Sequence, residues 1–71
     1  MRGKKELSGK ELGKLVEAHG WSLKRIHGSH HIYSKPGSEV RLSIPVHRNR
    51  PLKMGLLRHL LKLAGLDSSD S

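Results

Sequence analysis

The first segment with a regular apolar pattern follows Ser8 and has the spacing of an amphipathic helix. Four positions fall on one side of that predicted helix: Leu12, Leu15, Val16 and His19. Ser8 and Glu11 are spaced as in a capping box, where each side chain accepts a hydrogen bond from the other residue's backbone N–H. Gly20 favours the left-handed conformation that ends many helices, so we predict a helix between Ser8 and Gly20. Gly13 weakens this helix by about 1 kcal/mol relative to Ala, and His19 is expected to be half-buried.

Three segments with strand-like patterns come next. Residues 21–26 alternate at first and then change parity at Ile26, which indicates a β-bulge in the first strand. Residues 27–29 are predicted to form a tight turn, and residues 30–35 are predicted to form the second strand.

The third strand has the clearest alternation, and a turn at Pro36 and Gly37 precedes it. Pro presets φ at the second position of such a turn, and Gly supplies positive φ at the third. One face of the strand carries four apolar residues: Val40, Leu42, Ile44 and Val46. Pro45 cannot donate a hydrogen bond to a neighbouring strand, so we expect an edge strand or the end of the strand here.

A second helix is predicted from about Lys53 to Ala64, after a basic loop over residues 47–51. Its buried face contains five residues at helical spacing: Leu56, Leu57, Leu60, Leu61 and Ala64. Gly65 and Leu66 match the Schellman ending of a helix, in which the glycine adopts positive φ and Leu66 contacts Leu61.

The order of elements predicts an α+β domain, α-β-β-β-α, with two helices on one face of a three-stranded antiparallel sheet. Four residues are expected on the opposite, wet face: Arg41, Ser43, His31 and Tyr33. Trp21, at the start of the first strand, is expected to anchor the core. The domain covers residues 7–66, with a basic, flexible N-terminus over residues 1–6 and a polar tail over residues 67–71.

Composition narrows the class of protein further. The chain has 71 residues, enough for one small domain, and its single Trp, single Tyr and lack of Phe predict a mainly aliphatic core. The absence of Cys excludes disulfides, thiol catalysis and cysteine zinc sites, and agrees with a cytoplasmic location. Neither a signal peptide nor a membrane span is expected from the polar start and the short apolar runs. A formal charge of +8 favours a polyanionic partner such as nucleic acid or an acidic protein.

Six histidines in so short a chain are its most unusual feature. Imidazole titrates near neutral pH and can take a proton from one oxygen and return it to another. RNA carries its own nucleophile in the 2′-OH, so a ribonuclease needs a base, a proton donor for the leaving oxygen and cations for the phosphate. Five residues have that chemistry, if folding brings the turn near the basic loop: His30, His47, Arg48, Arg50 and Lys53.

Each of these residues also has a simpler interpretation. A His at the start of a strand is more often a surface residue than a catalyst, and a basic loop often serves only solubility. His30 and His31 point to opposite faces of a strand, so one metal ion is not expected to bind both. His59 is interpreted as a boundary residue of the second helix. Tyr33, as a single exposed aromatic residue, is weak support for a base-stacking surface.

Several short motifs, taken in order, resemble one known family. They are residues 12–17, Gly20-Trp21, Gly28-Ser29-His30-His31-Ile32-Tyr33, Ile44-Pro45-Val46-His47, residues 52–55 and residues 62–66. From about Leu7 to Leu66 the chain resembles the HicA family, small mRNA interferase toxins of prokaryotic HicAB toxin–antitoxin systems that are also called YcfA-like proteins. One departure is Met54, where relatives often carry Pro at the start of the second helix.

The resemblance implies a fold similar to a double-stranded RNA-binding domain, in agreement with the order of elements predicted above. The family's catalytic His lies in a turn-to-strand motif that falls on His30. Because two histidines are adjacent here, an alignment shifted by one residue would place the catalytic His at His31, which is the reserve candidate. His47 is then expected to support phosphate contact or proton transfer, and Gly28 and Ser29 are expected to touch RNA. No metal or other cofactor is implied.

The resemblance also implies partners. Messenger RNA is the expected substrate, and a HicB-type antitoxin is expected to cover the active site. We do not expect the protein to bind a membrane, or to bind DNA by itself. We therefore predict a metal-independent endoribonuclease in which Arg48, Arg50 and Lys53 hold phosphate. The alternative is a non-catalytic RNA-binding module, which rests on the same fold and charge.

Overall fold

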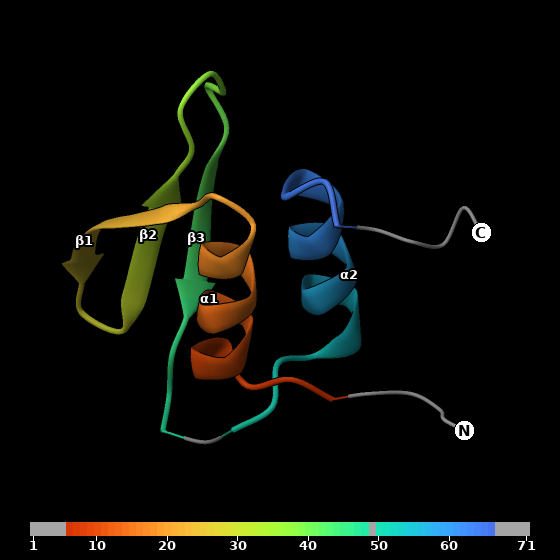
Figure 1. Ribbon diagram of the computed structural model, residues 1–71. Coiled ribbons are helices and arrows are strands. Elements are labelled where there is room, and N and C mark those ends of the chain that lie inside the picture. The colour runs from red at the N-terminus through yellow and green to blue at the C-terminus, as the bar shows by residue number, and fades with distance from the viewer. Residues whose placement is uncertain (1–5, 49, 67–71) are drawn as a thin grey trace.

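The computed structural model describes residues 6–48 and 50–66 of the chain. Five elements follow one another (Figure 1): α1 over Gly9–Ala18, β1 over Ser22–His27, β2 over His30–Ser34, β3 over Arg41–Pro45 and α2 over Met54–Leu63. The predicted α-β-β-β-α order and the α+β class are thereby confirmed. Apart from Glu6, the predicted N-terminal extension lies outside the described residues, as do the predicted tail over residues 67–71 and Asn49 of the basic loop.

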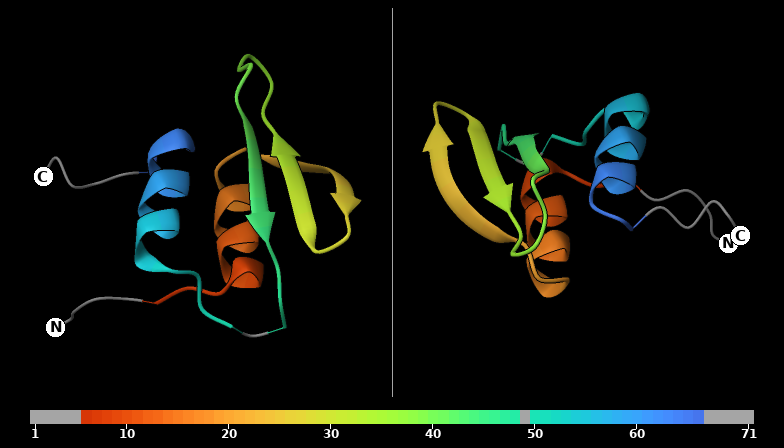
Figure 2. Two further views of the ribbon diagram at one scale, coloured as in Figure 1. Left: turned by 180° about the vertical axis from the view of Figure 1, so that it is seen from behind. Right: turned by 90° about the horizontal axis from the view of Figure 1, so that it is seen from above.

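The three strands form one antiparallel sheet in the order β1-β2-β3, so β1 and β3 are its two edges. Helix α1 packs across one face of the sheet and contacts β1 and β3, while α2 lies beside α1 and contacts β3 (Figure 2). Among the described residues, no helix lies against the opposite face (Figure 2). We call these two sides the covered face and the open face.

The core lies between the covered face and the helices. Four of its side chains have no exposed area: Leu12, Val16, Leu42 and Ile44. Trp21 is the predicted core anchor, with 4% of its surface exposed, and Leu57 and Leu60 complete the core from α2. The central apolar positions predicted for the first helix and the third strand therefore do face the core.

The orientation of β2 differs from the sequence prediction, which placed His31 and Tyr33 on the wet face. Directly opposite residues of antiparallel strands share a face of the sheet. Tyr33 pairs with Leu42 and His31 pairs with Ile44, so both lie on the covered face, and Tyr33 is only 5% exposed. The prediction was wrong because it took Ile32, the one aliphatic residue of this strand, to face the core. The larger Tyr33 ring takes that side instead, because it buries more apolar area.

The buried tyrosine explains why glycine occupies the middle of α1. A Cβ at Gly13 would clash with the Tyr33 hydroxyl oxygen, so the ring fits against the helix only because glycine has no side chain. Burial, and to a smaller extent the carboxylate of Glu17, raises the pKa of Tyr33 above the usual 10.0. Gly9 allows a similar approach at the end of β3, where a Cβ would overlap the Pro45 carbonyl group.

The predicted helix ends are confirmed. Ser8 Oγ accepts a hydrogen bond from the Glu11 backbone N–H at 3.1 Å, and the Glu11 carboxylate accepts one from the Ser8 N–H at 2.9 Å. The Leu66 N–H donates to the Leu61 carbonyl at 2.8 Å, as the Schellman motif requires. Gly37 has φ 83°, in agreement with its predicted place in the turn between β2 and β3.

Three details of the helices and of β1 refine the prediction. The change of parity in β1 is real, because the register shifts between Leu23 and Arg25 and so brings Leu23 and Ile26 onto the covered side. His19 is exposed rather than half-buried, since it caps the end of α1 where the chain turns away from the core. Leu56 is 36% exposed, because α2 meets the sheet mainly along β3 and buries a narrower stripe than predicted.

Candidate active site

A two-residue turn brings the histidines of β1 and β2 to one end of the sheet. His27 and His30 are paired partners, so Gly28 and Ser29 alone connect the strands. Gly28 has φ 60°, and positive φ at the first but not the second central residue is the type II′ pattern favoured in hairpins. Glycine suits this position because other residues rarely adopt that conformation. His30 therefore begins its strand directly after a tight, well-defined turn.

This turn is bonded to the chain that leaves β3. The Val46 N–H donates to the Ser29 carbonyl at 2.7 Å. Ser29 Oγ also lies 3.4 Å from His47 Nε2, where either the hydroxyl or the ring donates according to the imidazole tautomer. The turn and the start of the basic loop are thus side by side, which is the arrangement that a shared site would need.

The two adjacent histidines of β2 occupy different environments. His30 pairs with His27 on one side and Pro45 on the other, is exposed, and lies on the open face. His31 pairs with the fully buried Ile44, lies on the covered face, and is half-buried. Of the two side chains, that of His30 is therefore the more accessible to solvent. The recorded side-chain contact with His47 comes from Ser29 of the turn and not from His30 itself.

The basic loop forms a cationic cluster around His47. His47, Arg48 and Arg50 line a shallow hollow of about 310 Å³. A neighbouring hollow of about 230 Å³ has His47, Arg50 and Lys53 among its lining residues, together with apolar side chains such as Leu56. The predicted phosphate-binding residues therefore do gather at one place, next to the Ser29 turn. Their positive charges suit an anionic group such as phosphate.

Arg48 has an unusual backbone conformation within this cluster. Its φ is 55°, the one positive value found at a non-glycine position in the described chain. Such a conformation costs on the order of 1–3 kcal/mol and persists where the surrounding structure holds it. Here the Arg50 N–H donates to the His47 carbonyl at 3.0 Å and closes the turn that contains Arg48. The loop thus keeps Arg48 beside the His47 hollow.

No group of three or more His, Asp or Glu side chains within residues 6–48 and 50–66 is placed to hold a metal ion. What the site residues offer is proton transfer by imidazole together with binding of an anion by guanidinium and ammonium groups.

A second basic group lies on the open face and was not singled out from the sequence. It contains Lys24, Arg25, His27 and Arg41, which line one hollow with Ile32. The alternation of apolar and polar residues in β3 was enough to place Arg41 on the face away from the core. Arg25 was hidden by the register shift in β1, and the inverted parity of β2 obscured which residues shared that face.

The fold and the charge together describe a small, strongly basic α+β domain with the element order α-β-β-β-α. Residues 9–66 match the family model described as the HicA toxin of bacterial toxin–antitoxin, and this stretch includes every site residue discussed above. The chain belongs to this HicA toxin family. It is accordingly a toxin of a toxin–antitoxin pair, which implies an antitoxin partner.

The comparison with curated proteins found no match. In the part of the chain that the structure describes, α1 and α2 have ten residues each, and neither is long and apolar enough to cross a membrane.

Proposed function

We propose that this toxin is a metal-independent endoribonuclease that cleaves mRNA in the cytoplasm, with His30 as a general acid or base. The observation that supports it most is the docking of the Gly28–Ser29 turn against the chain after β3. The pairing of β2 with β3 sets the exposed His30 beside Pro45, two residues before His47, and the docked turn puts Ser29 Oγ 3.4 Å from His47 Nε2.

The proposed reaction uses the nucleophile that RNA carries. One imidazole accepts the proton of the 2′-OH as the 2′-oxygen forms a bond to phosphorus. The bond between phosphorus and the 5′-oxygen breaks, and that oxygen receives a proton from the second imidazole, leaving a 2′,3′-cyclic phosphate and a 5′-OH end. His30 and His47 are the two imidazoles in this scheme, with no assignment of which is base and which is acid.

The cations of the loop stabilise the charge that develops on phosphate. Arg48, Arg50 and Lys53 surround His47 and reach the same region of the surface. Fixed positive groups at a phosphate lower the barrier because they stabilise the transition state more than the ground state. The Gly28–Ser29 turn, which has little side-chain bulk, lets the RNA backbone approach closely. A HicB-type antitoxin that covers these residues is the proposed inhibitor.

A non-catalytic RNA-binding module is the second candidate. The basic residues of the open face favour it, since they form a binding surface without any requirement for catalysis. The two candidates differ in one product: a catalyst releases cut RNA, and a binding module does not.

The test is cleavage of an end-labelled mRNA in EDTA by the parent protein, His30→Ala and His31→Ala. Loss of a general acid or base lowers the rate by about 10²–10⁴-fold, so His30→Ala is expected to be almost inactive. His31→Ala is the matched control and is expected to retain cleavage, because His31 faces the helices. Circular dichroism and the melting temperature of His30→Ala should stay near those of the parent, since His30 is exposed.

Three other results of this assay would contradict the assignment of His30. Loss of cleavage in His31→Ala alone would transfer the role to the reserve histidine. Equal cleavage by all three proteins would reject the proposed catalyst. RNA binding without cleavage by the parent would favour the binding module.

A further inference from the structure

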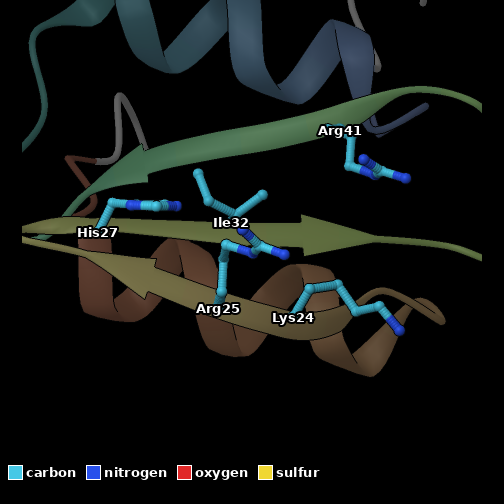
Figure 3. Close-up of a pocket in the computed structure, with 5 residues that line it drawn as sticks. All are labelled: Lys24, Arg25, His27, Ile32 and Arg41. Carbon is cyan, nitrogen blue, oxygen red and sulfur yellow. The ribbon is translucent and has the colours of Figure 1, made fainter.

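The open face of the sheet carries a basic hollow that the proposed catalytic residues do not use. Its volume is about 440 Å³, and five residues from all three strands line it (Figure 3): Lys24, Arg25, His27, Ile32 and Arg41. Ile32 lies in the middle of the group, with the basic side chains around it (Figure 3).

This hollow continues along the sheet in both directions. A second hollow of about 320 Å³ shares Lys24 and Arg41 with it and extends to Lys35 at the turn between β2 and β3. At the opposite end, His27 is the paired partner of His30. We call the basic residues that line the first of these hollows, Lys24, Arg25, His27 and Arg41, the open-face track. A strand of five or six residues spans about 17–20 Å, so the track is long enough for several phosphates.

The strands that carry the track bring no negative charge to it. The three described strands contain no Asp or Glu. Glu11 and Glu17 belong to α1 on the covered side, and Glu39, in the loop before β3, does not line either hollow. The exposed side chains of Lys24, Arg25 and Arg41 therefore have no neighbouring carboxylate from the strands, and their charge complements a polyanion.

The shape and composition of the track favour RNA over a protein surface. The cores of protein–protein interfaces are depleted of charged residues, and of Lys in particular, whereas this surface is cationic around a single Ile. Arg is the side chain best suited to phosphate, because its planar fork can donate two hydrogen bonds to one group. Arg25 and Arg41 come from opposite edge strands and so flank the line that leads to His30.

An unpaired strand fits the track better than a duplex. Duplex RNA is recognised mainly through contacts that span successive grooves, and the described cations of α2, Arg58 and Lys62, belong to an element away from the open face. Trp21 and Tyr33 are both buried, so the bases have no exposed Trp or Tyr ring among the described residues to stack on. Binding should therefore follow the phosphate backbone and depend little on base sequence.

We infer that the open-face track binds the unpaired RNA chain on one side of the scissile phosphate, with Arg25 and Arg41 as its main phosphate-binding residues. This inference rests on the proposed function in taking RNA as the substrate, and it adds a binding surface that the catalytic residues do not supply.

The test compares two double variants that remove the same charge. Arg25→Gln/Arg41→Gln alters the track, and Arg58→Gln/Lys62→Gln alters α2 as the matched control. The probe is a fluorescein-labelled, unstructured 2′-O-methyl RNA, which keeps the phosphates but lacks the free 2′-OH and so is not cleaved. Fluorescence anisotropy over a KCl series gives the affinity and its dependence on salt.

The track variant is expected to bind about tenfold more weakly at low salt, with the control near the parent. Its salt slope should fall by about 1.4, because each single-strand phosphate contact contributes about 0.7. All four residues are exposed, so the circular dichroism spectra of both variants should match that of the parent.

Other outcomes would overturn the inference. Equal losses in the two variants would mean that net charge alone governs binding, and no loss in either would mean that RNA lies elsewhere. Polyglutamate that binds the parent as tightly as RNA at equal salt, with the same loss in the track variant, would assign the surface to an acidic protein. Since the probe is not cleaved, failure here leaves the His30 assay untouched, and failure of that assay leaves this result standing.

Discussion

The two faces of the sheet are built from the same three strands but have opposite chemistry. Leu42 and Ile44 on the covered face have no exposed area, whereas Arg25 and Arg41 on the open face extend into solvent. Consecutive residues therefore meet different environments, and the adjacent histidines of β2 illustrate this most clearly. In this domain the face on which a residue lies decides its environment more than its chemical type does.

The two faces also contribute differently to the stability of the fold and to binding. Burial of apolar area on the covered face is the main favourable contribution to folding. Clustered positive charges on the open face repel one another and contribute nothing comparable, so their value to the protein lies in what they attract. Substitutions on the two faces should accordingly separate into effects on unfolding and effects on binding.

The largest expected effect is on the covered face. Leu42→Ala should lower the free energy of unfolding by about 2–5 kcal/mol, since it leaves a cavity among fully buried side chains. Ser43→Ala, the next residue and exposed, should change it by less than about 0.5 kcal/mol. Urea denaturation measures both. Ile44→Val, at about 0.5–1.5 kcal/mol, gives the same ranking if Leu42→Ala is too unstable to measure. Similar losses at residues 42 and 43 would contradict the assignment of faces.

A smaller effect is expected where α1 meets the covered face. Ala forms helices better than Gly by about 1 kcal/mol, so Gly13→Ala would stabilise a helix with free space around it. Here the added Cβ meets the Tyr33 hydroxyl, and we expect a net loss of about 1–2 kcal/mol. Tyr33→Phe removes that oxygen, so the double variant should recover most of the loss in a double-mutant cycle. A stabilising Gly13→Ala would show that the Tyr33 ring does not pack there.

The smallest effect is a pH dependence that also reports on which face Tyr33 occupies. Burial raises its pKa in the folded protein, so in the unfolded chain this tyrosine loses its proton first, from about pH 10. The stability that it contributes is complete below that pH and declines as the pH rises through the folded pKa. Denaturation of the parent and Tyr33→Phe over alkaline pH measures this, because lysine ionisation is common to both. Parallel curves would place Tyr33 in an ordinary, exposed environment.

Much of the fold could be predicted because its signals are local. The capping box at Ser8, the turn at Pro36 and Gly37, and the Schellman ending at Gly65 each depend on residues a few positions apart. The parity of β2 could not be predicted in the same way. It is set by pairing with Leu42 and Ile44 of another strand, and the strand's own sequence offers both an Ile and a Tyr as candidates for burial.

The candidate site was predictable in its residues but not in its arrangement. The chemistry of His30, His47 and the loop cations is apparent from their types. Their proximity depends on the Ser29 carbonyl accepting from the Val46 N–H, a contact between residues 17 positions apart. The open-face track was harder still, because Arg25 and Arg41 lie on opposite edge strands and share a face only through the register of β2 between them.

The bulge in β1 also bears on self-association. All six residues of this edge strand are exposed, and Leu23 and Ile26 are 40% and 55% exposed, so its free N–H and C=O groups could serve as a template for another extended chain. The register shift after Leu23 interrupts that template and leaves only residues 25–27 as a regular run. The irregularity that brings Leu23 and Ile26 onto one side thus also shortens the regular ladder that this edge offers to a neighbouring molecule.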